Sequence, residues 1–232
     1  MSTLSTSKRN TPAKPRAGRL KKGASAYHHG QLREALLAMA RRQLAAGHED
    51  IGLRELATAL GVTPNAVYRH FRGKDALLAA VAREGFLELT RATRDALAAA
   101  GAAPLAACGE AYLSFAQANP GMYKLMFGRG GRFPDEPGLT AAARECFDVM
   151  AAAVASTLSA PAKAAPPKAA ASSKAHASSR AAAPSMTAAV TTWALMHGYA
   201  LLRNEGLLAR LPEDQLPDAA TLVQALRLDA RP

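Results

Sequence analysis

The stretch LRELATALGVTPNAVYRHF, residues 53–71, holds two short helical patterns separated by a tight turn. In the first pattern, Leu56 and Leu60 stand four residues apart and therefore share one face of a helix. Gly61 follows, and glycine readily adopts the left-handed conformation with which many helices end. Pro64 suits the first turn of the next helix, where no amide hydrogen is needed. The stretch therefore predicts two short helices that meet at a sharp corner.

The spacing within this corner is that of a helix-turn-helix. Ala57 is small enough to let the two helices approach, Gly61 makes the turn, and Val67 packs the second helix on the first. The Thr63 hydroxyl can cap the second helix. Because Val67 and Phe71 are expected to face inward, the side chains between them are expected to face solvent.

Those outward-facing side chains have the chemistry that a DNA major groove requires. Asn65 can pair with adenine and Arg69 with guanine, and each pairing uses two hydrogen bonds. Tyr68 and His70 are suited to phosphates, which fix the register of a protein on DNA. Lys74 begins the next helix, where its ammonium group and the free amides can hold one phosphate together. The sequence therefore predicts that this corner presents a short helix to DNA.

Helical patterns also account for most of the remaining chain. An alanine-rich composition with only 5% aromatic residues favours helix, and neither a strand pattern nor a repeat period is evident. We therefore expect an all-α fold, with a three-helix head followed by a larger helical domain. Helices are expected over 28–46, 53–60 and 64–71, from 74 to 159 with breaks at 101–104, 119–121 and 128–138, and over 186–208 and 212–228.

The formal charge of +11 is concentrated in two segments. Residues 1–26 hold seven Lys or Arg and residues 160–185 hold four, with no acidic residue in either segment. The second segment is rich in Ala, Pro, Lys and Ser, a composition that cannot build a packed core. We expect both segments to be disordered, either as solvated linkers or as tethers that screened electrostatic attraction draws to polyanions.

Several classes of protein are disfavoured by what the sequence lacks. No apolar run approaches the roughly 18 residues of a membrane-spanning helix, and residues 1–26 lack the apolar core of a signal peptide. The two cysteines, Cys108 and Cys146, form no CxxC motif, which favours a reduced cytoplasmic protein. His28 and His29 face apart on a helix without further ligands, so neither a metal nor a cofactor is expected. No nucleophile and base stand at a recognisable spacing, so we expect no enzyme activity.

The stretch GLRELATALGVTPNAVYRHFRGKDALL, residues 52–78, resembles the TetR family of bacterial transcription regulators. The family signature there is YxHF and the lysine three residues beyond it. YHHGQLREALL at 27–37 is similar to the first helix of one TetR subgroup, and WALMHG at 193–198 matches the C-terminal Trp, His and Gly of that subgroup. NPGMYKLMFG at 119–128 is also similar to this subgroup.

The resemblance implies a homodimer with a DNA-binding head over about 27–87 and a C-terminal regulatory and dimerisation domain over about 88–228, which the segment 160–185 interrupts. In the family, the last two helices of each subunit, here about 186–228, form the dimer interface. Many members cap the second helix with Ser or Thr, whereas this chain has Gly52, which caps nearly as well. The resemblance also implies a cytoplasmic, nucleoid-associated bacterial protein whose partner is double-stranded operator DNA.

The function that the resemblance implies is that of a sequence-specific, ligand-responsive repressor, which binds a palindromic operator and answers to an unknown small-molecule effector. The resemblance also implies a DNA contact for Arg54, early in the second helix. Non-specific, architectural DNA binding through the basic segments is the alternative that the sequence leaves open. The predicted DNA-binding residues are Arg54, Thr63, Asn65, Ala66, Tyr68, Arg69, His70 and Lys74.

The C-terminal domain has enough large side chains to line an effector pocket. Met and aromatic residues suit adaptable, mostly apolar binding surfaces, and ordinary core packing is the alternative for each of them. Trp193 and His197 stand four residues apart and share a helix face, where a packed core with a hydrogen-bonded histidine is the main alternative. The candidate pocket residues are Phe86, Tyr112, Phe115, Tyr123, Met126, Phe127, Phe147, Met150, Trp193, Met196 and His197.

Overall fold

The computed structural model describes residues 29–48, 50–101, 103–128, 133, 138–159 and 182–226 of the 232-residue chain, and within these ranges it contains helices and no strand. The all-α fold predicted from the sequence is confirmed. The α-helices are α1 (His29–Ala45), α2 (Leu53–Ala59), α3 (Pro64–Tyr68), α4 (Lys74–Ala99), α5 (Pro104–Ala118), α6 (Pro120–Gly128), α7 (Leu139–Ser159), α8 (Ala182–Asn204) and α9 (Ala219–Ala225), and a short 3₁₀ helix, η1, spans Glu213–Gln215.

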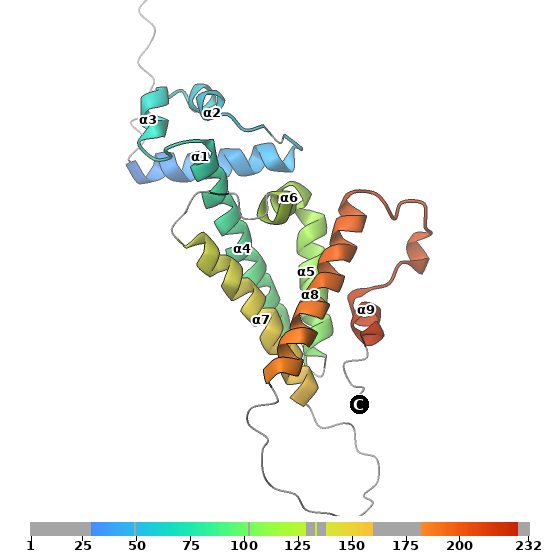
Figure 1. Ribbon diagram of the computed structural model, residues 1–232. Helices are drawn as coiled ribbons and strands as arrows, with labels where there is room; N and C mark the ends of the chain where they lie inside the picture. Colours follow the sequence, from blue (N-terminus) through green and yellow to red (C-terminus); the bar gives the residue numbers. More distant parts are fainter. Residues whose placement is uncertain are drawn as a thin grey trace, which may run out of the picture.

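The helices form a small head joined to a longer helical body (Figure 1). α1, α2 and α3 make the head, and α4 runs from the head down the length of the body. In the body, α4 packs against α5 and α7, α8 packs against the same two helices, and α9 lies against α5. α6 contacts α1 as well as α4 and α5, so it lies between the head and the body.

The turn between α2 and α3 is built as the sequence predicts. Gly61 has a φ of +66°, and its amide donates to the Thr58 carbonyl. The Val62 amide donates to the Ala57 carbonyl. These two hydrogen bonds are those of a Schellman motif, which closes the C-terminal end of a helix. Because Ala57 and Val67 are also buried, backbone hydrogen bonds and apolar packing together hold the corner.

The head differs from expectation at both ends of α3. The helix ends at Tyr68, because the chain then tightens and the amides of His70 and Phe71 both donate to the Val67 carbonyl. Thr63 occupies the position before the helix, but its hydroxyl makes no capping hydrogen bond to any described residue. The predicted cap is therefore wrong. The proline that follows stands at the first helical position, where its missing amide hydrogen leaves one fewer unpaired donor in the first turn.

α8 begins earlier and ends earlier than predicted. It begins at Ala182, because Pro184 falls in the first turn, where a helix does not use the amide hydrogen. It ends at Asn204 and does not continue to Leu208. Gly206 causes this end, because its φ of +69° takes the chain out of the helical conformation.

The basic segments fall largely outside the described residues. Residues 1–26, His28 and residues 160–181 are not among those described, and neither are residues 227–232. Residues 182–185, which the sequence assigns to the second disordered segment, instead form the first turn of α8. Among the helices of the described ranges, none has the length and apolar character needed to cross a bilayer.

The final helix is much shorter than the predicted 212–228. η1 replaces its first turn, and α9 begins only at Ala219. Pro217 explains the interruption, because proline has no amide hydrogen and disfavours helical geometry in the residue before it. The Asp218 carboxylate then caps α9 by accepting a 2.7 Å hydrogen bond from the Thr221 amide.

Candidate DNA-binding surface and effector pocket

α3 has one buried side and one exposed side. Val67 has no exposed surface and Phe71 is 3% exposed, so the inner side belongs to the core of the head. Asn65 and Arg69 are exposed, and Tyr68 is 43% exposed. These three side chains therefore point away from the core, in the orientation that contact with DNA requires.

The other candidate DNA-contacting residues differ in their exposure to solvent. Arg54 on α2 and Thr63 at the start of α3 are exposed. Ala66, His70 and Lys74 are half-buried. The eight candidates thus lie on α2, on α3 with its flanking residues, and at the start of α4, with different degrees of access to solvent.

Lys74, which we expect to hold a DNA phosphate, forms an ion pair within the head. Its ammonium group forms an ion pair with the Asp50 carboxylate, whose side chain is 95% exposed. A DNA phosphate has to compete with this carboxylate for the ammonium group. Because an exposed ion pair contributes at most about 1 kcal/mol, the exchange costs little. Lys74 also starts α4, so the free amides of that first turn lie beside it.

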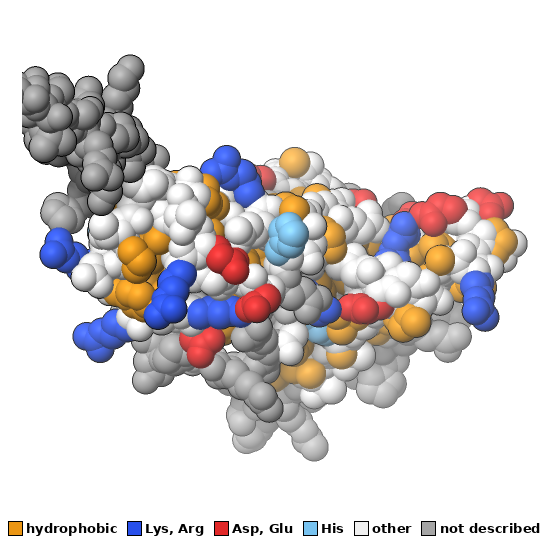
Figure 2. All heavy atoms as spheres, turned by 90° about the horizontal axis from the view of Figure 1, so that it is seen from above, with side chains coloured by type: hydrophobic (Ala, Val, Ile, Leu, Met, Phe, Trp, Pro, Cys, Tyr) orange, Lys and Arg blue, Asp and Glu red, His pale blue; other side chains and the backbone are white. Residues whose placement is uncertain are grey.

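The surface around α3 carries more positive than negative charge. Figure 2 views the molecule from the side of the head, where Lys and Arg side chains lie beside exposed hydrophobic ones, with some Asp and Glu side chains among them. Such a surface attracts a phosphate backbone independently of sequence, whereas Asn65 and Arg69 are able to read base edges. Between residues 53 and 74 the basic side chains are Arg54, Arg69, Arg72 and Lys74, and the acidic side chain is Glu55.

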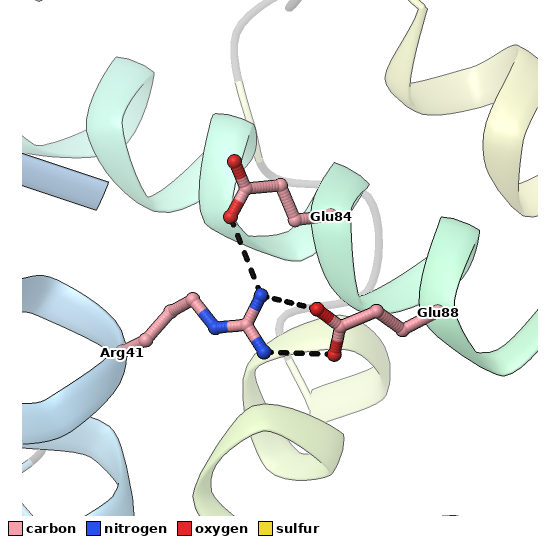
Figure 3. Close-up of polar contacts among 3 residues, drawn as sticks. All are labelled: Arg41, Glu84 and Glu88. Atoms are coloured by element: carbon pink, nitrogen blue, oxygen red, sulfur yellow. Dashed lines mark hydrogen bonds and ion pairs between the residues drawn. The ribbon is translucent and has the colours of Figure 1, made fainter. Parts of the chain in front are cut away.

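Arg41 of α1 holds the head to α4 (Figure 3). Its guanidinium group donates two hydrogen bonds to the Glu88 carboxylate, of which the bond from Nη2 to Oε2 is 2.8 Å long. Nη1 also lies 3.5 Å from Oε2 of Glu84. The hydrogen bonds to Glu88 raise the pKa of Arg41 above its ordinary value. Because a paired fork fixes orientation as well as charge, this contact restrains the rotation of α1 against α4.

α6 presses directly on the C-terminal end of α1. A Cβ atom at Gly121 would lie 2.3 Å from the Leu44 carbonyl oxygen, so only glycine fits at this position. On the other side, a Cβ atom at Gly85 of α4 would lie 2.5 Å from the Met126 sulfur. Two glycines therefore let α6 pack closely against both α1 and α4, and a displacement of α6 would disturb the head.

A cavity of about 390 Å³ lies in the body, bounded by α4, α5, α6, α7 and α8. Seven of the eleven candidate pocket residues are on its wall, namely Phe86, Tyr112, Phe127, Phe147, Met150, Trp193 and Met196. The wall residues that the sequence does not predict are Thr93, Leu105, Cys108, Gly109, Ala143, Cys146 and Thr192.

Four candidate residues do not line this cavity. Phe115 and Met126 are buried in the core, where Met126 packs against α4. Tyr123 and His197 lie behind the wall and bond there to the Tyr112 hydroxyl. The prediction that these four line the cavity is therefore wrong. Large side chains on one helix face serve a core as well as a cavity, and the sequence pattern does not separate the two.

The wall residues that the sequence does not predict are mostly small. On α5, Leu105, Cys108 and Gly109 precede Tyr112 at the i, i+3, i+4 and i+7 spacing, so this stripe is readable in the sequence. The Thr, Ala and Cys side chains from α4, α7 and α8 carry no such signal. Small residues pack equally well in a filled core and in the wall of a cavity.

A hydrogen-bonded polar group stands at one side of the cavity. Tyr123 Oη lies 2.7 Å from His197 Nδ1 and 2.9 Å from Tyr112 Oη. Tyr112 Oη lies 3.1 Å from His197 Nδ1. Burial raises the pKa values of both tyrosines and lowers the pKa of His197. All these groups are therefore uncharged at neutral pH.

Both cysteines of the chain also lie on the cavity wall. Burial raises the pKa of the Cys108 thiol to about 11 and that of the Cys146 thiol to about 11. At neutral pH the two side chains are therefore protonated thiols, which are weak nucleophiles.

Comparisons with known proteins agree with this architecture. Residues 36–81 match the family model of bacterial regulatory proteins of the tetR family, and residues 105–226 match the model described as the tetracyclin repressor-like C-terminal domain. No curated protein matches the chain significantly.

Solved structures are similar over most of the chain. A protein of unknown function from Rhodococcus sp. RHA1 is 30% identical with a TM-score of 0.63, over 87% of this chain and 95% of that one. A provisionally assigned regulatory protein designated SCO4313 is 24% identical with a TM-score of 0.59, over the same shares of the two chains. A provisionally assigned transcriptional regulator from Pseudomonas aeruginosa PAO1 is 19% identical, covers 85% of this chain and 86% of that one, and has a TM-score of 0.51. The exposed helix of the head, the helical body and these matches together show that the chain belongs to the TetR family of transcription regulators.

Proposed function

We propose that this protein is a repressor that binds a palindromic operator as a homodimer and leaves it when a small molecule fills the cavity. The observation that carries the proposal is the exposure of Asn65 and Arg69 on α3, with Val67 between them fully buried. A helix arranged in this way enters a major groove without disturbing the core of the head. In this assignment, Asn65 and Arg69 read bases. Phosphates are held by Arg54, Thr63, Tyr68, His70 and Lys74, and the Ala66 methyl group lies against the bases.

A second copy of the chain packs on α8 in this proposal. Val190, Leu201 and Leu202 of this helix are exposed apolar side chains. Gly198 stands among them, and a Cβ atom there would meet no heavy atom of a described residue within 4 Å. An apolar helix face with a glycine near its middle suits close packing against the same face of a second copy across a two-fold axis. Such a dimer presents two α3 helices to successive major grooves.

The effector acts through α6 in this proposal. Phe127 of α6 is on the cavity wall, and Gly121 of the same helix lies against the end of α1. A molecule that displaces α6 favours head orientations other than the one that fits the operator, and the populations shift accordingly. The contact of Arg41 with Glu88 is a restraint that such a shift has to alter.

A binding-site selection with the full chain, repeated at two salt concentrations, tests the reading of DNA sequence. We expect a palindrome to be enriched at both concentrations. Arg69→Ala should weaken operator binding by about 1–3 kcal/mol and relax the preference at one base pair of each half-site. Arg91→Ala is the matched control, because it removes an exposed charge of the same sign from the body end of α4.

The alternative function gives a different result in the same experiment. An architectural protein would select no palindrome, would lose affinity steeply with salt, and would bind normally after Arg69→Ala. Its binding would instead depend on residues 1–26, which carry seven positive charges.

A further inference from the structure

The chemistry of the cavity wall limits what the cavity accepts. Among the described residues that line it, none carries a charge at neutral pH. The titratable members are Tyr112, Cys108 and Cys146, and burial holds all three in their neutral, protonated forms. A charged ligand would lose its hydration here without meeting an opposite charge, at a cost of several kcal/mol.

The hydroxyl groups on the wall already have partners. Thr93 donates to the Leu89 carbonyl at 2.9 Å, and Thr192 donates to the Ala188 carbonyl at 2.8 Å. Both bonds lie within the helix that carries the threonine. The wall threonines therefore have no hydroxyl hydrogen to spare for a ligand.

The hydroxyl hydrogens of the polar group behind the wall also have acceptors within that group, so we call the group closed. Within this group, the hydrogens of Tyr112 and Tyr123 have each other's oxygen atoms and His197 Nδ1 as acceptors. Every hydrogen finds an acceptor only when His197 Nδ1 accepts, which places the imidazole hydrogen on Nε2. The shortest of the distances, 2.7 Å between Tyr123 and His197, fits this arrangement. No tyrosine hydrogen is left to point into the cavity.

Rings and sulfur atoms make most of the remaining wall. Phe86 and Phe127 meet edge to face with their centroids 5.3 Å apart, and Phe147 meets Trp193 edge to face at 6.1 Å. The sulfur atoms come from Met150, Met196, Cys108 and Cys146. Aromatic rings and sulfur atoms both make favourable contacts with a further aromatic ring.

We propose that the effector is an uncharged, planar aromatic molecule that is held by ring and sulfur contacts and accepts no hydrogen bond from the hydroxyl groups of the wall. This inference rests on the proposed function of the cavity as the effector site. A volume of about 390 Å³ is near the lower end for pockets of drug-sized ligands, and it suits two or three fused rings.

Calorimetry with the full chain and three probes on one ring system tests the exclusion of charge. The probes are 2-methylnaphthalene, 2-naphthoate and 2-naphthylmethylammonium. We expect the hydrocarbon to bind at least 100-fold more tightly than either ion. Binding of an ion within threefold of the hydrocarbon overturns the proposal, and so does a failure of the hydrocarbon to bind.

An operator titration in parallel separates this inference from the proposed function. If the hydrocarbon binds and operator affinity does not change, the ligand class is supported and the effector role of the cavity is contradicted. If the chain selects no operator at all, the repressor assignment fails whichever probe binds.

The closed polar group is tested with two variants. His197→Leu removes the acceptor that uses the last tyrosine hydrogen, so Tyr123 can donate to Tyr112 and the Tyr112 hydroxyl on the wall can donate to a ligand carbonyl. The affinity of 2-acetylnaphthalene relative to 2-ethylnaphthalene should therefore rise about tenfold. Tyr123→Phe should leave the ratio unchanged, because the Tyr112 hydroxyl can still donate to His197, 3.1 Å away. The same ratio in His197→Leu and in the unchanged chain overturns the closed arrangement.

Discussion

Gly61 sets the direction in which the chain leaves α2 and enters α3. Its φ of +66° lies in the left-handed region, and no heavy atom of a described residue stands within 4 Å of the place its Cβ would take. A methyl group there would meet no clash, so only the backbone conformation opposes it. Replacement of this glycine therefore measures backbone strain alone.

We expect Gly61→Ala to lower the free energy of unfolding by about 1–2 kcal/mol, the usual cost of the left-handed conformation for other residues. Gly73→Ala is the matched control, because Gly73 also has open space but has a φ of −179°, which any residue adopts. Urea unfolding followed by circular dichroism measures both variants. A loss for Gly61→Ala no larger than for Gly73→Ala would contradict this account of the turn.

Single residues were predictable where neighbouring atoms decide their position. Gly61, Val67 and Asn65 behave as expected, because turn geometry and helix periodicity act over a few residues. Lys74 pairs instead with Asp50, 24 residues earlier in the chain, and no local rule anticipates that contact. The predicted capping hydrogen bond of Thr63 is absent. The orientation of its hydroxyl also depends on surroundings that neighbouring residues do not determine.

At the scale of elements, α6 connects the cavity with the head. It contacts α1, α4 and α5, and its two close approaches depend on glycines in α6 and α4. At the direct contact between Gly121 and the Leu44 carbonyl there is no gap to absorb a shift towards α1. A small displacement of α6 is therefore passed on to α1.

We expect Gly121→Ala to destabilise the protein by about 1–3 kcal/mol through overpacking. We also expect it to weaken operator binding severalfold, because the new methyl group pushes α6 away from the Leu44 carbonyl oxygen. Gly128→Ala, at the other end of α6, is the control, since its Cβ would meet Lys124 Cγ at an ordinary 3.5 Å. Thermal unfolding and operator titration measure the two effects. Unchanged operator affinity in Gly121→Ala would exclude α6 as the connection.

The existence of each helix was easier to predict than its ends. The long helices follow from a sustained apolar period, as in α4. The predicted last helix is longer than α9, because the apolar spacing continues on both sides of Pro217. The helical backbone cannot continue through this residue, since proline has no amide hydrogen. Pro217 therefore places the start of α9 near Asp218.

At the scale of the whole molecule, the apolar face of α8 needs a partner. Met186 is 54% exposed and Val190 is 46% exposed, and Leu202 near the other end of the helix is 41% exposed. In a lone chain these side chains would be left in water. The proposed dimer buries them, and it also sets the separation of the two α3 helices.

We expect Gly198→Leu to raise the dissociation constant of the dimer at least a hundredfold, because the new side chain stands where two α8 helices meet. The single chain should stay folded, since the space around Gly198 is open and leucine favours helix more than glycine does. Ala152→Leu, on an exposed position of α7, is the control for added apolar surface. Sedimentation velocity measures association, and circular dichroism measures folding. A folded Gly198→Leu variant that remains dimeric at low micromolar concentration would contradict the interface.

Site residues that lie close together in the sequence were predictable, and site residues that come from distant helices were less so. The candidate DNA-facing residues all lie between residues 54 and 74, so one short stretch of sequence contains them. The cavity draws on five helices, and its smaller members, such as Gly109 and Ala143, become recognisable only after the chain folds. Tyr123 and His197 were misplaced because their hydrogen bonds join α5, α6 and α8.

Trp193 is the sole tryptophan of the chain, and it lines the cavity while keeping 36% of its surface exposed on α8. Its indole therefore stands between the space for a guest molecule and the face offered to a second subunit. The fluorescence of this one chromophore should respond both to occupancy and to assembly. Dilution series with and without a guest would separate the two contributions without any attached label.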